Sequence, residues 1–162
     1  MGAAAFGWYA TRMRILGVDF GQRRIGLALS DETALLASPW QSLTAGATPE
    51  DSAAAVADLL RRSERVAAIV VGLPRRLNGT ETDQTGPARA FAAALGRLTK
   101  LDVHLQDERL SSHEADRRLA ERERDWRRRK ARLDAAAAAV ILQDFLDGRP
   151  GGAVASGTGD AC

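Results

Sequence analysis

The chain has 162 residues, enough for one domain with a hydrophobic core that needs no disulfide or structural metal. Hydrophobic residues make up 45% and charged residues 27%, which is ordinary for a globular protein. The one cysteine, Cys162, excludes an intramolecular disulfide and is compatible with a reducing compartment. No apolar stretch reaches the roughly 18 residues that a membrane helix needs. We therefore expect a cytoplasmic protein with no membrane contact.

The net charge of +2 is too small to indicate nucleic-acid binding, but basic residues are unevenly distributed. Nine arginines and lysines lie between Arg117 and Arg132, with only three acidic residues among them. This arginine-rich segment could neutralise several phosphates of a nucleic acid. It could equally be the solvated face of a helix stabilised by i,i+4 ion pairs.

The first third of the chain predicts three strands and a helix. The apolar runs at 14–20 and 25–30 are separated by a tight turn, and 40–43 is a third candidate strand. Together they suggest an antiparallel meander. Pro49 then opens a helical pattern that continues to Arg62, because proline is tolerated in the first turn of a helix.

The middle of the chain predicts a strand, a helix and another strand. Residues 66–72 form a continuous apolar run, typical of a central strand covered on both faces. The connection at 74–87 is either a functional loop or simply a long, turn-rich link. A helix follows at 88–99 and an alternating strand at 101–106. The helix is expected to turn Phe91, Leu95 and Leu98 inward.

The last third predicts two helices. Ser111 or Ser112 would cap the first, with Glu114 completing a capping box. The second covers 133–146 and is ended by Gly148. We expect three parts: an N-terminal extension at 1–12, one α/β domain at 13–147, and a flexible tail at 148–162.

Asp19 lies where the first strand ends, just before Gly21. A carboxylate at the end of a buried strand is costly without a cationic partner, and a metal ion would supply one. Gly21 would let a phosphate approach the backbone closely. The same residues also fit a plain turn, with a capping aspartate and a glycine that permits the bend.

Two further acids occupy comparable positions. Glu108 follows the last strand, although an acid there is also common as a helix cap or as the partner of Arg109. Asp134 opens the last predicted helix on the face of Ala138 and Ile141, which should pack on the sheet. The helix dipole alone would favour an acid at that position, but its place on the buried face favours a ligand.

Asp19, Glu108 and Asp134 would converge from two strand ends and one helix start. Three carboxylates suit a pair of Mg²⁺ or Mn²⁺ ions, which prefer oxygen ligands. Such ions activate a water and stabilise the leaving oxygen of a phosphodiester, with Asp19 expected to contact both. The two histidines are isolated and offer no zinc site, and the sequence contains no P-loop motif.

Four ordered blocks between Arg14 and about Asp147 resemble a known family. They are Asp19-x-Gly-x-x-Arg24-Ile25-Gly26, then Gly72-Leu-Pro with Asn78-Gly79-Thr80-Glu81, then Asp107-Glu108-Arg109-Leu110-Ser111, and finally Lys130 with Asp134-x-x-Ala137-Ala138 and Ile141-Leu142-Gln143. The sequence resembles the YqgF/RuvX family, whose members are described as Holliday-junction resolvases and as pre-ribosomal-RNA nucleases. Ala131 departs from the glycine that the family commonly has after the lysine.

The resemblance implies a ribonuclease-H-like fold, with a mixed five-stranded sheet whose first three strands are antiparallel, flanked by helices. It also implies a metal-dependent nuclease in which Asp19, Glu108 and Asp134 are catalytic and bind the metal ions. Three basic residues match family positions suited to phosphate. With Gly21 and a loop asparagine they complete the predicted nucleic-acid-binding set, which is Gly21, Arg24, Asn78, Arg109 and Lys130.

The favoured substrate is precursor 16S ribosomal RNA, processed at its 5′ end, and a four-way DNA junction is the alternative. Junction cleavage would need a symmetric dimer. No dimerisation stripe is evident, so we expect a monomer or weak homodimer acting on structured RNA. A catalytically silent nucleic-acid-binding module is disfavoured by the three acids. An actin-like ATPase would need a far longer chain.

Overall fold

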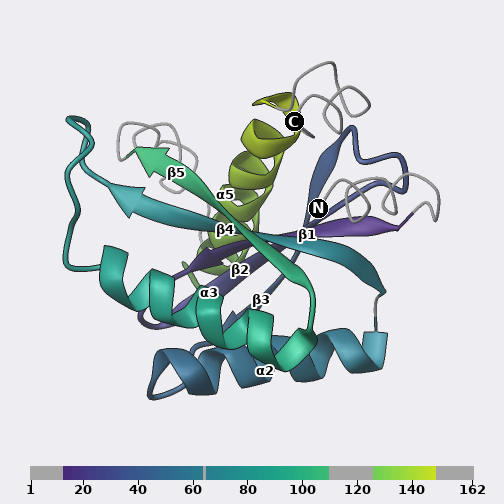
Figure 1. Ribbon diagram of the computed structural model, residues 1–162, viewed down its shortest axis with the longest axis horizontal. Coiled ribbons are helices and arrows are strands. Elements are labelled where there is room, and N and C mark those ends of the chain that lie inside the picture. Colours follow the sequence, from purple (N-terminus) through teal and green to yellow (C-terminus); the bar gives the residue numbers. More distant parts are fainter. Residues whose placement is uncertain (1–12, 64, 110–125, 149–162) are drawn as a thin grey trace, which may run out of the picture.

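A computed structural model describes residues 13–63, 65–109 and 126–148 of the protein (Figure 1). Five strands form one sheet in the order β3-β2-β1-β4-β5. The strands are β1 (Arg14–Phe20), β2 (Arg24–Ser30), β3 (Ala37–Thr44), β4 (Val66–Arg75) and β5 (Asp102–Arg109). The helices are α2 (Pro49–Ser63), α3 (Thr85–Thr99) and α5 (Trp126–Gly148).

The sheet is mixed. Strand β2 pairs antiparallel with both β1 and β3, whereas β4 pairs parallel with both β1 and β5. This confirms the predicted ribonuclease-H-like sheet, with its first three strands antiparallel. Because β1, β4 and β5 are parallel, their carboxyl ends meet at one edge of the sheet, and β2 begins at that same edge.

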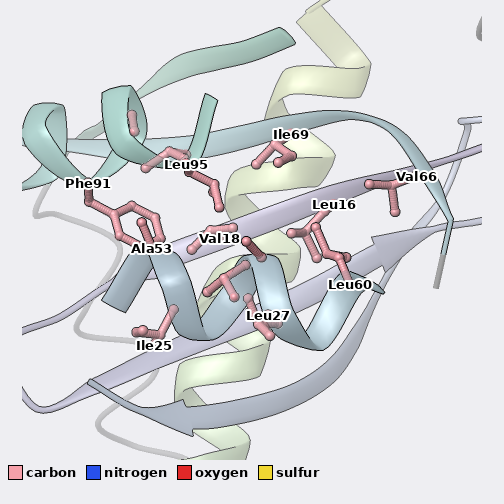
Figure 2. Close-up of a cluster of buried hydrophobic side chains, with 14 of the residues drawn as sticks. Leu16, Val18, Ile25, Leu27, Ala53, Leu60, Val66, Ile69, Phe91 and Leu95 are labelled. Atoms are coloured by element: carbon pink, nitrogen blue, oxygen red, sulfur yellow. The ribbon is translucent and has the colours of Figure 1, made fainter. Parts of the chain in front are cut away.

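One face of the sheet packs on α2 and α3. Alternation along β1 and β2 turns every second residue toward these helices, where it meets apolar side chains from both of them and from β4. Figure 2 shows this cluster, in which the labelled residues are Leu16, Val18, Ile25, Leu27, Ala53, Leu60, Val66, Ile69, Phe91 and Leu95. The continuous apolar run of β4 is explained by its position, since both of its faces are covered.

The opposite face packs on α5, which crosses behind the sheet in Figure 1. Three glycines on this face bring helix and sheet together. A Cβ atom at Gly17 would lie 2.6 Å from Leu142 Cβ, one at Gly72 would lie 2.6 Å from Ile141 Cδ1, and one at Gly26 would lie 1.9 Å from the Asp134 carbonyl oxygen. No side chain larger than hydrogen fits between α5 and these strands, so glycine sets how closely the helix approaches.

The structure corrects the predicted start of the last helix. Helix α5 begins at Trp126 and not at 133, so Asp134 lies about two turns inside it. Arginine, lysine and alanine are good helix formers, and no glycine or proline interrupts 126–132. The prediction that Asp134 opens a helix was therefore wrong, and the helix dipole does not account for its position.

Other boundaries also differ from the predictions. Strand β4 continues to Arg75 and β5 to Arg109, because the two strands keep pairing as far as Arg75↔Arg109. Since α3 begins at Thr85, the connection is 76–84 and not 74–87. Strand β3 starts at Ala37, paired with Ser30. Leu98, predicted to face inward, is 47% exposed because the apolar cluster under α3 ends at Leu95.

Some predictions fall on parts of the chain that the structure does not describe. These are the extension at 1–12, the capping box from Ser111 to Glu114, the arginine-rich segment before Trp126 and the tail after Gly148. None of the helices in the described parts is long and apolar enough to cross a membrane.

Candidate active site

A pocket of about 440 Å³ opens at the sheet edge where β1 and β5 end and β2 begins. The three predicted acids share this pocket, although they come from two strands and a helix. Its lining comprises Asp19, Phe20, Gly21, Gln22, Arg23, Arg24, Pro74, Gln84, Glu108 and Asp134. The fold thus brings together carboxylates that are up to 115 positions apart in the sequence, the separation of Asp19 and Asp134 (134 − 19).

Strand alternation explains why these side chains share one face of the sheet. Asp19 lies two residues after Gly17, which faces α5, so Asp19 is directed to the same face. On β5, His104 packs against Phe145 of α5 with ring centroids 5.2 Å apart, and Glu108 lies four residues later in the same alternation. Asp19 and Glu108 therefore stand on the face of the sheet that packs on α5, the helix that carries Asp134.

Glycine also makes room for Glu108. A Cβ atom at Gly72 of the neighbouring strand would lie 3.2 Å from Glu108 Oε2, closer than such contacts usually are. Because Gly72 has no Cβ, the carboxylate of Glu108 can lie over β4, toward β1. The Gly72-Leu-Pro block therefore shapes the site from within β4.

Asp134 is held by an ion pair. Arg24 Nε donates a hydrogen bond to Asp134 Oδ2 at 2.8 Å, and both side chains are about 30% exposed (30% and 28%). Ser42 Oγ on β3 donates to the same oxygen at 3.5 Å. Arg24 thus lines the pocket and also contacts one of the three acids.

The three acids of the pocket are chemically suitable ligands for a divalent metal ion. Asp19, Glu108 and Asp134 supply hard oxygen donors around one pocket, and Gly72 leaves space for the carboxylate of Glu108. Within the described ranges, no three His, Cys, Asp or Glu side chains are already gathered closely enough to hold a metal ion. Metal binding would therefore require the side chains of the three acids to turn toward one another. Asp134 would have to turn away from Arg24 to do so.

Gly21 serves the turn between β1 and β2. Its N–H donates to the Arg24 carbonyl oxygen at 3.0 Å, and a Cβ atom there would lie 2.7 Å from that oxygen. The glycine is required by the turn itself, which was one of the two interpretations of the motif. It also lines the pocket, so the structure is compatible with the close approach of a phosphate.

Asn78 does not line the pocket. Its Oδ1 accepts hydrogen bonds from Thr80 N at 3.0 Å and from Thr80 Oγ1 at 2.7 Å, so its side chain closes the turn in which it lies. The side chains of Arg109 and Lys130, the other two predicted phosphate-binding residues, lie outside the described part of the chain.

Several residues of the site were not predicted from the sequence, namely Arg23, Gln84 and Ser42. The sequence does carry a signal for Arg23, because this residue adjoins Arg24 in the turn motif. Gln84 immediately precedes α3 and lines the pocket. Ser42 contacts Asp134 through the β2–β3 register, which pairs Ser42 with Gly26. Neither of the last two carries a recognisable motif in the sequence.

Known proteins resemble this chain over almost all of the described range. The family model of RuvX, described as Holliday junction resolvase, matches residues 13–148. A protein of Anaeromyxobacter sp. named "Putative pre-16S rRNA nuclease" is 48% identical over 137 residues, which are 85% of this chain and 98% of that protein. A protein of the same name from Pelotomaculum thermopropionicum is 41% identical over 140 residues, 85% of this chain and 90% of that protein.

Among solved structures, Thermus thermophilus RuvC in complex with a Holliday junction substrate superposes with a TM-score of 0.49 at 16% identity, covering 86% of this chain and 96% of that one. The assignment of family rests on the sequence matches, which span the strands, the pocket and α5. This chain belongs to the RuvX family.

Proposed function

We propose that this protein is a divalent-metal-dependent nuclease that hydrolyses phosphodiester bonds and processes the 5′ end of precursor 16S ribosomal RNA. The observation that carries the proposal is the shared pocket of Asp19, Glu108 and Asp134. Relatives at 41–48% identity that bear the pre-16S rRNA nuclease name support the choice of substrate.

Asp19, Glu108 and Asp134 would hold Mg²⁺ or Mn²⁺ in this proposal. When bound, such ions lower the pKa of a water and stabilise negative charge on the leaving oxygen. The protein contributes the position of each carboxylate: Asp19 from the end of β1, Glu108 over Gly72, and Asp134 from within α5.

The arginines at the pocket would bind the substrate backbone. Arg23 and Arg24 both line it, and guanidinium groups bind phosphate oxygens through several N–H donors. Arg24 uses its Nε on Asp134, and a guanidinium has four further N–H donors. Arg24 can therefore contact a phosphate through these donors, and its Nε is released as well when Asp134 turns away to a metal ion.

The test is Mn²⁺-dependent cleavage of an end-labelled precursor 16S rRNA fragment beside a four-way DNA junction. Asp19→Asn should reduce cleavage by about a thousandfold or more while the circular dichroism melt stays close to that of the parent. Asp102→Asn is the matched control, because Asp102 is exposed and lies at the opposite end of β5 from Glu108. Equal cleavage by the Asp19 variant and the parent would refute the proposal.

Holliday-junction resolution is the second candidate, favoured by the description of the matching family. It would require a symmetric dimer, because two strands must be cut at symmetry-related positions. Junction cleavage without RNA cleavage, together with a dimer in sedimentation, would establish it in place of RNA processing. We propose a monomer or weak homodimer acting in the cytoplasm on structured RNA.

A further inference from the structure

The connection between β4 and α3, residues 76–84, starts and ends at the pocket. Pro74 lies just before it and Gln84 is its last residue, and both line the pocket. Figure 1 shows the connection projecting beyond the ends of the strands before it returns to α3. A nucleic acid with one phosphate in the pocket would therefore pass beside this connection.

The connection is held by its own hydrogen bonds. Arg76 N donates to Thr80 O at 2.9 Å, and Gly79 N donates to Arg76 O at 2.8 Å with Gly79 at φ 87°. Asn78 adds two bonds to Thr80. At the base, Thr85 Oγ1 donates to Pro74 O at 2.6 Å, which ties the start of α3 to the end of β4. The tip of the connection, residues 76–80, is thus held in its shape by bonds within the connection itself.

Leu77 lies in this tip and is 67% exposed. The bonds that close the turn are made by the backbone and by polar side chains, so the turn itself does not require a leucine. Arg76, which precedes it directly, is exposed, whereas Arg75 forms an ion pair with Asp107, with Nε and Oδ1 3.3 Å apart. An exposed apolar side chain next to an exposed arginine, on a connection whose two ends reach the carboxylate pocket, suits a nucleic acid, with a phosphate for Arg76 and a base face for Leu77.

We propose that Leu77 contacts the face of an unstacked nucleobase of the bound strand, taking the place of a neighbouring base in the stack. Apolar side chains that insert between bases act in this way in other nucleic-acid-binding proteins. Leu77 would then select substrates with an unpaired or distorted position next to the cleaved bond. This inference rests on the proposed nuclease function and specifies what that site recognises.

The experiment places 2-aminopurine at successive positions around the cleavage site of the precursor RNA and around the branch of the junction. The fluorescence of this base rises when it loses its stacking neighbours. Measurements use the full-length chain with Asp19→Asn, so that the nucleic acid stays intact. We expect the protein to raise the fluorescence at one or two positions, and Leu77→Ala to remove most of that rise.

Further variants distinguish the loss of a contact made by Leu77 from a general effect on the structure. Leu98→Ala is the matched control, since Leu98 is also exposed but lies near the far end of α3. Leu77→Phe should keep the rise, because a phenyl ring also stacks on a base. Asn78→Ala should diminish it by loosening the tip. With Asp19 intact, Leu77→Ala should slow cleavage of the structured substrate about tenfold, within the range for loss of one stacking contact.

An unchanged fluorescence rise with Leu77→Ala, or an equal loss with Leu98→Ala, would overturn the proposal. Its failure is distinguishable from failure of the nuclease function. Cleavage that depends on Asp19 but not on Leu77 would refute only the role of Leu77. Base unstacking that depends on Leu77, in a protein that cleaves neither nucleic acid, would refute only the nuclease. A protein that binds neither would overturn both.

Discussion

The guanidinium of Arg24 and the carboxylate of Asp134 form an ion pair across the site, with Nε and Oδ2 2.8 Å apart. The pair joins the first residue of β2 to the interior of α5 across 110 positions of sequence. Arg24 therefore supplies a positive charge to a carboxylate that a metal ion would otherwise neutralise.

Replacing Arg24 with methionine removes this charge and keeps a side chain of similar length. We expect Mn²⁺ to bind about threefold more tightly, because a partly exposed ion pair is worth about 1 kcal/mol or less. Cleavage should nevertheless fall, because a phosphate-binding group is lost. Mn²⁺ titration by electron paramagnetic resonance measures the first effect and gel assays measure the second.

Arg23→Met is the control for this prediction. Arg23 lines the same pocket without the ion pair to Asp134, so its loss should weaken cleavage while leaving Mn²⁺ affinity nearly unchanged. Similar Mn²⁺ affinities for the Arg24 variant and the parent would show that Arg24 does not compete with the metal.

Gly26 sets the distance between β2 and α5. A Cβ atom at this position would lie 1.9 Å from the Asp134 carbonyl oxygen, so Gly26→Ala must displace the helix that carries Asp134. We expect a loss of about 3 kcal/mol in the free energy of unfolding, at the upper end for overpacked sites, together with loss of cleavage. Urea denaturation measures the first quantity.

Gly86→Ala is its matched control. No atom lies within 4 Å of a Cβ at Gly86, which is in the first turn of α3. Alanine should change the free energy of unfolding by less than about 1 kcal/mol, because its preference for the helix is opposed by the restriction that Pro87 places on the residue before it. If both variants lost stability equally, the close approach of α5 would not be the cause.

Ser30 satisfies a buried backbone group. Its hydroxyl accepts from Ile15 N at 2.8 Å and donates to Asp31 O at 2.9 Å, and the residue is 2% exposed. Ser30→Ala leaves the Ile15 N–H without this acceptor and should cost about 1–3 kcal/mol of unfolding free energy. Ser63→Ala, which removes a hydroxyl from an exposed site at the end of α2, should change stability by less than about 0.5 kcal/mol.

Asp31 organises the turn between β2 and β3. Burial raises the pKa of its carboxyl, but hydrogen bonds from Leu36 N, the Thr33 hydroxyl and Leu35 N outweigh that effect and lower the pKa from 3.8 to about 2. A carboxyl whose pKa is lower in the folded state stabilises the fold above its unfolded pKa. That stabilisation is lost as the pH falls through the folded pKa.

Asp31→Asn should therefore be less stable than the parent above about pH 4, and the difference should shrink as the pH approaches 2. Urea midpoints measured across this range test the prediction. Asp102→Asn, at an exposed position on β5, is the comparison variant. A difference between Asp31→Asn and the parent that stayed constant from neutral pH to about pH 2 would show that the hydrogen-bonded carboxylate is not its source.

Much of the fold was predictable because the hydrophobic pattern within each strand indicated its secondary structure. The alternation of β1 and β2 and the continuous apolar run of β4 each have a distinctive period, and all three strands were found. The boundaries of α5 and β5 were not, because helix-forming arginines and strand-pairing polar residues are not distinctive by themselves. Their ends depend on what the backbone pairs with.

The candidate site divides in the same way. Local patterns identify the three available acids, Asp19, Glu108 and Asp134, and show that the first two follow strands at comparable points. The folded structure is needed to show that Asp134 comes from within α5, that Arg24 pairs with it, and that Asn78 bonds within its own turn. Sequence patterns record which face of an element is buried, whereas these contacts depend on how closely α5 approaches the sheet. That distance is set by Gly17, Gly26 and Gly72, where a Cβ atom would clash with α5. The role of these glycines is evident only when the helix is seen packed against them.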